Sequence, residues 1–333
     1  SMILNEKKGV SFLSETIEKV HEAAKTLGYT KKESKSQTQT IFNHKTILVL
    51  TPTVTSPYYA SLIQSIEQEA LKHEIRVIVQ NTYRDKVREL EFLNQVKDSN
   101  LYGIISTMTP NNIGLLEKIN LTIPVVVVND KSNDVDLDTV EINNYSAGVL
   151  IAKHMIELGH KNIAYISTTL NQINTARVMR LEGISDTYKT LCPKGNVIIK
   201  SKNIKPVEEI ENINLEHDVG YELTLDALKH KEITGFIAVN DMVAYGVMEA
   251  LLEKNYSIPK DYSLCGFDNL FPSSFKQISL TTVEHYIVNK GQNAVEMIKN
   301  KQSSSSGPFS STKVLFKHEL IVRSSTGKPR KMK

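Results

Sequence analysis

Residues 46–80, TILVLTPTVTSPYYASLIQSIEQEALKHEIRVIVQ, contain two β-branched runs separated by an amphipathic segment. The runs TILVLT at 46–51 and RVIVQ at 76–80 have the length and composition of strands. The apolar residues between them recur at helical spacing: Tyr59, Leu62, Ile63, Ile66 and Ala70. Short β-branched strands that alternate with amphipathic helices predict a parallel sheet covered on both faces.

The same alternation continues toward the C-terminus in two series. Further strands are expected at 103–106, 124–128, 162–167, 235–239 and 262–267. The first series ends with a helix at 145–158, and the strand at 162–167 starts the second. We therefore predict an α/β fold with two doubly wound parallel-sheet subdomains.

A small separate unit precedes these two series. Ser14 is expected to cap a helix that Gly28 ends. Its apolar residues recur at helical spacing: Ile17, Val20, Ala24 and Leu27. The polar segment 30–45 has neither an apolar stripe nor strand alternation, which is typical of a linker.

Composition excludes several protein classes. The 333 residues are 40% hydrophobic and 23% charged, and no apolar run approaches the roughly 20 residues that span a bilayer. No secretory signal is present, so a cytoplasmic protein is expected. Cys192 and Cys265 are too few and too far apart in sequence for a disulfide framework or a zinc site. The basic tail 326–333 is expected to be a solvated end rather than a nucleic-acid site.

Several motifs in a fixed order resemble the LacI/GalR family of bacterial transcriptional regulators over nearly the whole chain. Each motif is weak alone, and the order and spacing make the set specific. The motifs are Ser56-Pro57-Tyr58-Tyr59, Ile123-Pro124-Val125-Val126, Asn143-Asn144 with Ala147-Gly148, Glu157-Leu158-Gly159-His160, Arg180-Leu181-Glu182-Gly183, Asn240-Asp241, Gly266-Phe267-Asp268 and Leu280-Thr281-Thr282.

The resemblance implies a clamshell like that of periplasmic binding proteins, preceded by a helix-turn-helix headpiece that binds operator DNA. Residues 1–29 would be the remnant of that headpiece, with its first helices upstream of residue 1, and 30–45 its linker or hinge. Its candidate DNA contacts are Ser1, Asn5, Lys7, Lys8 and Tyr29. The expected N-terminal subdomain is 46–160 plus about 286–316, and the C-terminal subdomain is 161–285 plus about 317–325. A homodimer is also implied, with helices at 58–72 and 241–254 as its candidate interface.

Candidate effector-binding residues follow predicted strands. Ligands of open parallel sheets bind at the carboxyl ends of the strands, where Tyr58, Asp241 and Asp268 are expected. Tyr58 offers a stacking face for a sugar or belongs to the core. Asp268 is expected either to accept hydrogen bonds from two ligand hydroxyls or to cap the backbone of its own turn. Asp241 is equally a helix N-cap or a ligand contact, and Asn240 is the better contact candidate.

The resemblance adds further effector contacts. Ser56 belongs to the first motif. Members of the family commonly bind their effector with an arginine in the region that Arg177 and Arg180 occupy here. We favour Arg177 for the ligand and Arg180 for structure. Asn129 and His285 match cleft positions and serve either ligand contact or hinge packing.

These observations predict a transcriptional regulator, most simply a repressor, controlled by a sugar or sugar phosphate and using no cofactor or metal. Two alternatives remain: control by a protein co-regulator, and a sugar-binding transport receptor, which would need an export signal. An enzyme is disfavoured because the sequence has no G-x-G-x-x-G, G-x-x-x-x-G-K-[ST], G-x-S-x-G or H-E-x-x-H motif.

Overall fold

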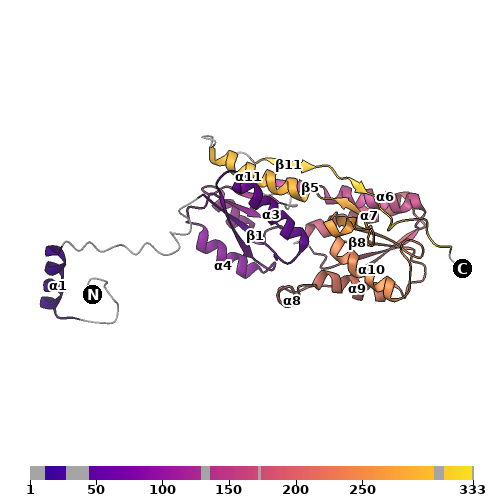
Figure 1. Ribbon diagram of the computed structural model, residues 1–333, viewed down its shortest axis with the longest axis horizontal. Coiled ribbons are helices and arrows are strands. Elements are labelled where there is room, and N and C mark those ends of the chain that lie inside the picture. The colour runs from indigo at the N-terminus through magenta and orange to yellow at the C-terminus, as the bar shows by residue number, and fades with distance from the viewer. Residues whose placement is uncertain (1–11, 28–44, 129–135, 172–173, 304–310, 332–333) are drawn as a thin grey trace. The chain divides into compact units, whose positions relative to one another are not determined.

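The computed structural model describes residues 12–27, 45–128, 136–171, 174–303 and 311–331. Contacts divide the chain into two compact units, residues 1–43 and residues 44–333. The second unit holds two sheets with their helices (Figure 1). We call each sheet with its helices a lobe.

The first unit contains α1 (Ser14–Thr26). The expectation that Ser14 caps this helix is wrong, because Ser14 is the first helical residue and Leu13 occupies the cap position. The Leu13 carbonyl accepts a hydrogen bond from the Ile17 N–H at 3.1 Å, so the backbone itself starts the helix. The expected stop, Gly28, lies outside the described residues, as does the linker except for its last residue.

The first lobe is built on a parallel sheet with the strand order β11-β5-β4-β3-β1-β2. Its strands are β1 (Thr46–Thr51), β2 (Arg76–Asn81), β3 (Gly103–Ser106), β4 (Val125–Val128), β5 (Asp138–Ile142) and β11 (Lys313–Phe316). Every residue of β1, β3 and β4 is buried, as expected for strands covered by helices on both faces. The edge strand β2 is partly exposed.

The second lobe repeats this plan with the strand order β12-β10-β9-β8-β6-β7. Its strands are β6 (Asn162–Ser167), β7 (Asn196–Ser201), β8 (Gly235–Ala238), β9 (Ser263–Asp268), β10 (Thr281–Glu284) and β12 (Leu320–Ile321). All neighbouring pairs are parallel except β10 and β12. The predicted pair of doubly wound, parallel-dominated sheets is confirmed.

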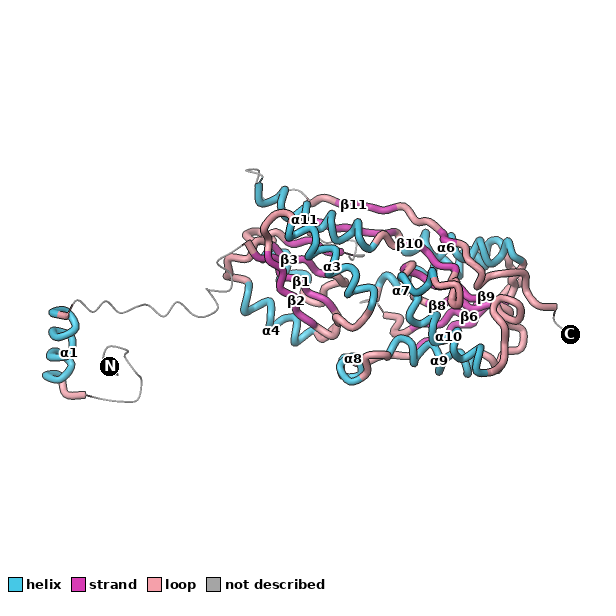
Figure 2. The backbone as a smooth tube through the Cα atoms, in the orientation of Figure 1, coloured by secondary structure: helices cyan, strands magenta, loops and turns pink. Residues whose placement is uncertain are grey.

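Each lobe contains helices as well as its sheet (Figure 2). The first lobe has α3 (Pro57–Leu71), α4 (Lys86–Val96), α5 (Ile113–Ile119) and α11 (Ile287–Ser303). The second lobe has α6 (Asn144–Leu158), α7 (Thr175–Leu191), α8 (Pro206–Glu211), α9 (Leu215–Ala227), α10 (Asp241–Glu253) and the 3-10 helix η1 (Phe271–Ser274). Among the described residues, no helix has the length and apolar character needed to cross a membrane.

The chain joins the lobes between β5 and α6, between β10 and α11, and between β11 and β12. We expected the first subdomain to run to residue 160. Instead, α6 buries Ala147, Ile151 and Met155 in the core of the second sheet. The boundary therefore falls just before α6, because the apolar face of this helix packs on the sheet that follows it in sequence.

Two glycines allow α6 and α7 to approach each other closely. A Cβ atom built on Gly148 would lie 2.2 Å from the Arg180 carbonyl oxygen, and one on Gly183 would lie 2.1 Å from the Tyr145 carbonyl oxygen. Real Cβ atoms do not come this close to backbone oxygen, so only glycine fits at both contacts. The close packing fixes α7, the helix that carries Arg177 and Arg180.

The expectation of a solvated C-terminal end is wrong for Gly327 and Arg330, whereas Lys328 and Lys331 are exposed as expected. The Arg330 guanidinium lies 4.2 Å from the centre of the Tyr262 ring, a cation–π distance. The Gly327 carbonyl oxygen lies 2.9 Å from Nε2 of the buried His160. Gly327 and Arg330 are thus held on the second lobe, because their polar and charged groups have partners there.

Candidate functional site

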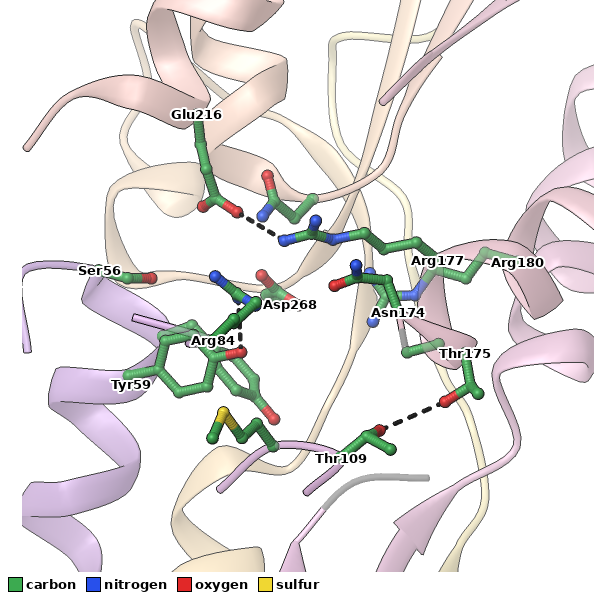
Figure 3. Close-up of a pocket in the computed structure, with 14 residues that line it drawn as sticks. Ser56, Tyr59, Arg84, Thr109, Asn174, Thr175, Arg177, Arg180, Glu216 and Asp268 are labelled. Carbon is green, nitrogen blue, oxygen red and sulfur yellow. Dashed lines mark hydrogen bonds and ion pairs between the residues drawn. The ribbon is translucent and has the colours of Figure 1, made fainter. Parts of the chain in front are cut away.

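A cavity lies between the two lobes, where residues that follow the strands of both sheets face one another (Figure 3). We call it the first chamber, and its volume is ≈ 90 Å³. This is the carboxyl-end location that open parallel sheets use for ligands. Its lining residues are Ser56, Tyr58, Tyr59, Arg84, Met108 and Thr109 from the first lobe, and Asn174, Thr175, Ala176, Arg177, Arg180, Glu216, Asn240 and Asp268 from the second.

A second chamber of ≈ 240 Å³ adjoins the first. The residues common to both chambers are Ser56, Tyr59, Arg84, Arg177 and Glu216. The remaining residues of the second chamber are Thr53, Thr55, Pro57, Thr168, Ile204, Glu209, Asn212, Ile213, Asn214, Leu215 and Met242.

The aromatic wall of the first chamber comes from the start of α3. Pro57 begins this helix, and its fixed backbone angle suits the first helical position. The next two residues, Tyr58 and Tyr59, meet edge to face with ring centres 5.1 Å apart. Lys290 donates a hydrogen bond of 3.3 Å to the Tyr58 hydroxyl, which holds that ring in place. Ser56 lies just before the helix and also lines the chamber.

Asp268 ends β9 and places its carboxylate in the first chamber (Figure 3). Its φ of 113° lies in a region that residues other than glycine rarely adopt, and such strain concentrates at functional sites. Oδ1 lies 2.9 Å from Nδ1 of His285, and both side chains are buried. Burial raises the pKa of Asp268 and lowers the pKa of His285. The carboxyl group is thus oriented by the protein on one side and faces the cavity on the other.

The two arginines of α7 both line the first chamber, but the protein binds them differently. Arg180 donates to Asn144 Oδ1 at 2.8 Å and to the Val239 carbonyl at 2.5 Å. Arg177 has a longer ion pair, 3.5 Å, with Glu216. Burial and the neighbouring Arg84 lower the pKa of Arg177. Arg180 is thus held by two short hydrogen bonds and Arg177 by one long ion pair, and the role of Arg177 as the effector contact stays a prediction.

Arg84 was not predicted from the sequence. It follows β2 and donates a hydrogen bond of 3.3 Å to the Tyr59 hydroxyl (Figure 3). It also forms an ion pair with Glu209 of α8, in the opposite lobe. Glu216 likewise was not predicted, although it opens α9 near the cleft. Arg84 lies in the loop after the predicted strand 76–80, and that position was the one available signal.

Asp241 is not at the cavity, contrary to expectation. Its Oδ1 accepts a hydrogen bond from Thr282 at 2.7 Å, and its Oδ2 accepts from the Leu270 N–H at 2.9 Å and from Ser273 at 2.7 Å. Burial raises its pKa to about 6. Nor does it cap α10, because Asn240 is the cap residue. Asp241 therefore anchors the segment after β9, and the predicted ligand contact is wrong.

Asn240 serves two purposes. Its Oδ1 accepts a hydrogen bond of 2.9 Å from the Val243 N–H, which caps α10, and the residue also lines the first chamber. His285 does not line either chamber. It is buried between Asp268, Arg180 and Tyr58, so its position corresponds to the packing alternative.

Six predicted site residues lie outside the described residues. One is the candidate effector contact Asn129. The others are the candidate DNA contacts Ser1, Asn5, Lys7, Lys8 and Tyr29.

Comparison with known proteins identifies the family. The model described as "Periplasmic binding proteins and sugar binding domain of LacI family" matches residues 44–319. The chain belongs to the LacI family. It is therefore an effector-controlled transcriptional regulator. The predicted membership in the LacI/GalR family is confirmed.

Curated relatives of this LacI-family chain are named HTH-type transcriptional repressor PurR. The protein from Haemophilus influenzae (strain PittEE) is 29% identical over 98% of this chain and 93% of its own length. The one from Mannheimia succiniciproducens is 26% identical over 98% of this chain and 94% of its own length. Among solved structures, a LacI family transcriptional regulator from Enterococcus faecalis V583 with bound ribose is 25% identical, with a TM-score of 0.71. That match covers 85% of this chain and 99% of the other.

Proposed function

We propose that this LacI-family chain is a repressor whose effector, a sugar or sugar phosphate, binds in the first chamber. One observation carries the proposal: the Asp268 carboxylate, the Arg177 guanidinium and the Tyr58 ring come from three different elements and line one cavity. Asp268 would accept hydrogen bonds from ligand hydroxyls, and such charge-assisted bonds are stronger than neutral ones. Tyr58 would stack on the apolar face of the sugar ring.

Similarity to the regulator from Enterococcus faecalis, which was crystallised with bound ribose, supports a sugar as the effector. The charge of the chamber is in keeping with a sugar or a sugar phosphate. Three arginines and two carboxylates line it, so the carboxylates can accept hydrogen bonds from hydroxyls and the arginines can balance a phosphate.

The effector would act by holding the two lobes at one angle, since its contacts come from both. Ligand binding shifts such an equilibrium only by its different affinity for the two states. In a homodimer the change would alter the spacing of the two DNA-binding headpieces, and operator half-sites have a fixed separation. The helices α3 and α10 would form the dimer interface, as membership in the family implies. Such a regulator would act in the cytoplasm.

Replacement of Asp268 by Asn tests the site. Asparagine keeps the size of the side chain and tolerates positive φ, so the fold should persist. Two charge-assisted hydrogen bonds would be weakened, so we expect effector affinity measured by titration calorimetry to fall by at least about 100-fold. Asp98→Asn, an exposed substitution after α4, is the matched control. Unchanged affinity in Asp268→Asn would contradict the proposed site.

A further inference from the structure

The segment between β7 and α9 reaches from the second lobe to the first. It contains α8, a helix of 6 residues none of which is buried, so no apolar core holds this helix on its own lobe. Just before it, the Ile204 N–H donates to Thr169 Oγ1 at 2.7 Å. The helix itself lies at the cleft: Glu209 lines the second chamber, and Ile210 lines a surface pocket whose other residues belong to the first lobe. The position of α8 therefore depends on contacts with the opposite lobe.

Arg84 is the first-lobe partner of α8. Tyr83 and Arg84 are consecutive residues with φ of 52° and 54°, a conformation that residues other than glycine rarely adopt and that concentrates at functional sites. From this turn Arg84 forms an ion pair with Glu209 and donates to the Tyr59 hydroxyl at 3.3 Å. The side chains of Arg84 and Glu209 are only 18% and 13% exposed. Salt therefore screens their attraction less than that of an exposed ion pair.

Closure of the lobes also brings like charges together. Burial, and then the charge of Arg84, lower the pKa of Arg177, so the guanidinium groups of the two lobes repel each other. Arg177 has Glu216 of its own lobe as a partner. Glu209 offsets the repulsion because it pairs with Arg84 across the cleft. Loss of the Glu209 charge should therefore favour separation of the lobes.

Another contact between the lobes is weaker. The Thr109 hydroxyl of the first lobe and the Thr175 hydroxyl at the start of α7 lie 3.4 Å apart, which is long for a hydrogen bond between hydroxyls. Both groups are neutral, whereas charge on both partners strengthens a hydrogen bond. The ion pair between Arg84 and Glu209 is therefore the contact of the two whose loss should change the lobe angle more.

We propose that α8 is a latch, in which the ion pair of Glu209 with Arg84 holds the two lobes closed before any effector binds. The proposal does not depend on the identity of the effector. It implies that the ligand-free protein already populates the closed form. Because the apparent affinity of a ligand depends on the fraction of molecules in the binding-competent state, the latch would also set the ligand concentration to which the regulator responds.

The test measures the separation of the lobes in the ligand-free chain. Spin labels are attached through Lys97→Cys in the first lobe and Lys229→Cys in the second, both at exposed positions. Cys192→Ser removes the partly exposed native thiol, and Cys265 is buried. Labelled chain is diluted with unlabelled chain, so that double electron–electron resonance reports distances within one subunit. We expect the unaltered latch to give one narrow distribution of distances.

Variants then remove the latch. Glu209→Gln keeps the size of the side chain and removes its charge, and Arg84→Gln removes the guanidinium. We expect each to shift the distribution to longer distances and to broaden it. The double variant should open no further than either single variant, because both changes remove the same interaction. Glu211→Gln, an exposed change on the same helix, is the matched control and should leave the distances unchanged.

The latch would be overturned by unchanged distances in Glu209→Gln and Arg84→Gln. A double variant that opens by the sum of the two single effects would also overturn it, because the two residues would then act independently. Neither result bears on the proposed function, since the Asp268→Asn titration tests the effector site separately.

Discussion

At the residue scale, the chemistry of the cleft depends on which polar groups the protein uses for itself. Arg180 makes two short hydrogen bonds to buried acceptors, and its guanidinium lies 4.8 Å from the centre of the Phe267 ring. Arg177, three residues earlier on the same helix, forms a long ion pair with Glu216 at 3.5 Å. Two residues of the same type therefore have different consequences when they are replaced.

Replacement of Arg180 by Met should destabilise the fold, because Asn144 and the Val239 carbonyl lose their donor in a buried setting. We expect the free energy of unfolding to fall by about 2–4 kcal/mol. Arg177→Met should cost less stability than Arg180→Met, because its single ion pair with Glu216 is long, while it weakens effector binding. Urea denaturation of both variants measures the difference. Equal losses of stability would refute this division of roles.

The same distinction explains what sequence reasoning missed at this scale. Asn240 and Asp241 both follow a strand, and either could face the ligand. The structure turns Asp241 inward to the segment at 270–273 and leaves Asn240 at the chamber. Those partners are some 30 residues away in sequence, so no local pattern indicated the direction of the Asp241 side chain.

At the scale of elements, the approach of α6 to α7 holds the arginine-bearing helix against the second sheet. The contact depends on Gly148 and Gly183, which each meet backbone oxygen of the opposite helix. A side chain at either position would push the helices apart.

Gly183→Ala should therefore destabilise the second lobe. An added Cβ would lie 2.1 Å from the Tyr145 carbonyl oxygen, so the helices must separate, and overpacking of this kind costs about 1–3 kcal/mol. Thermal or urea unfolding measures the loss. The matched control is Gly114→Ala in α5, where nothing lies within 4 Å of the added atom. That control should be neutral or more stable by up to about 1 kcal/mol, and an equally harmless Gly183→Ala would refute the packing argument.

Strand and helix order was predictable because β-branched runs and helical periodicity are local signals. The lobe to which α6 belongs was not predictable, because its buried face of Ala147, Ile151 and Met155 would suit either sheet. The packing of residues 326–331 was also missed. The sequence of a basic tail does not predict that Arg330 packs on the Tyr262 ring.

At the scale of the whole molecule, the site is a product of two lobes. Tyr58 and Asp268 could be placed at the cleft from the sequence, because the carboxyl ends of parallel strands face the binding crevice. The pairing of Arg84 with Glu209 could not, because it depends on how the lobes face each other. The sequence of the segments that join the lobes does not predict this orientation.

Folding of the second lobe also has a predictable dependence on pH. His160 is buried and contacts Thr234, Ser263 and Gly327, and burial lowers its pKa. An unfolded histidine titrates near 6.5, so as pH falls through that value the unfolded chain binds a proton that the folded chain resists. The contribution of His160 to the free energy of unfolding therefore decreases with acidification, by up to about 1.4 kcal/mol per pH unit.

Buried Asp241 and Asp268 have raised pKa values, so their contributions to the free energy of unfolding increase as the pH falls. The contribution of His160 must therefore be isolated with a variant of that residue. We expect His160→Gln to be less stable than the unaltered chain at pH 7.5. This gap, the difference in their free energies of unfolding, should be smaller at pH 5.5. Urea denaturation at both pH values measures the gap. His230→Gln, a substitution of a partly exposed histidine, is the control. A gap for His160→Gln that is the same at both pH values would refute the argument.

The central claim is that a sugar-class effector binds at the Asp268 chamber, and a thermal-shift screen tests it most directly. A ligand that binds only the folded chain raises its apparent melting temperature. We predict that sugars, among a panel of sugars, sugar phosphates and nucleobases, raise the melting temperature of the unaltered chain and do not raise that of Asp268→Asn. A shift produced only by nucleobases, or a sugar shift that persists in Asp268→Asn, would contradict the account.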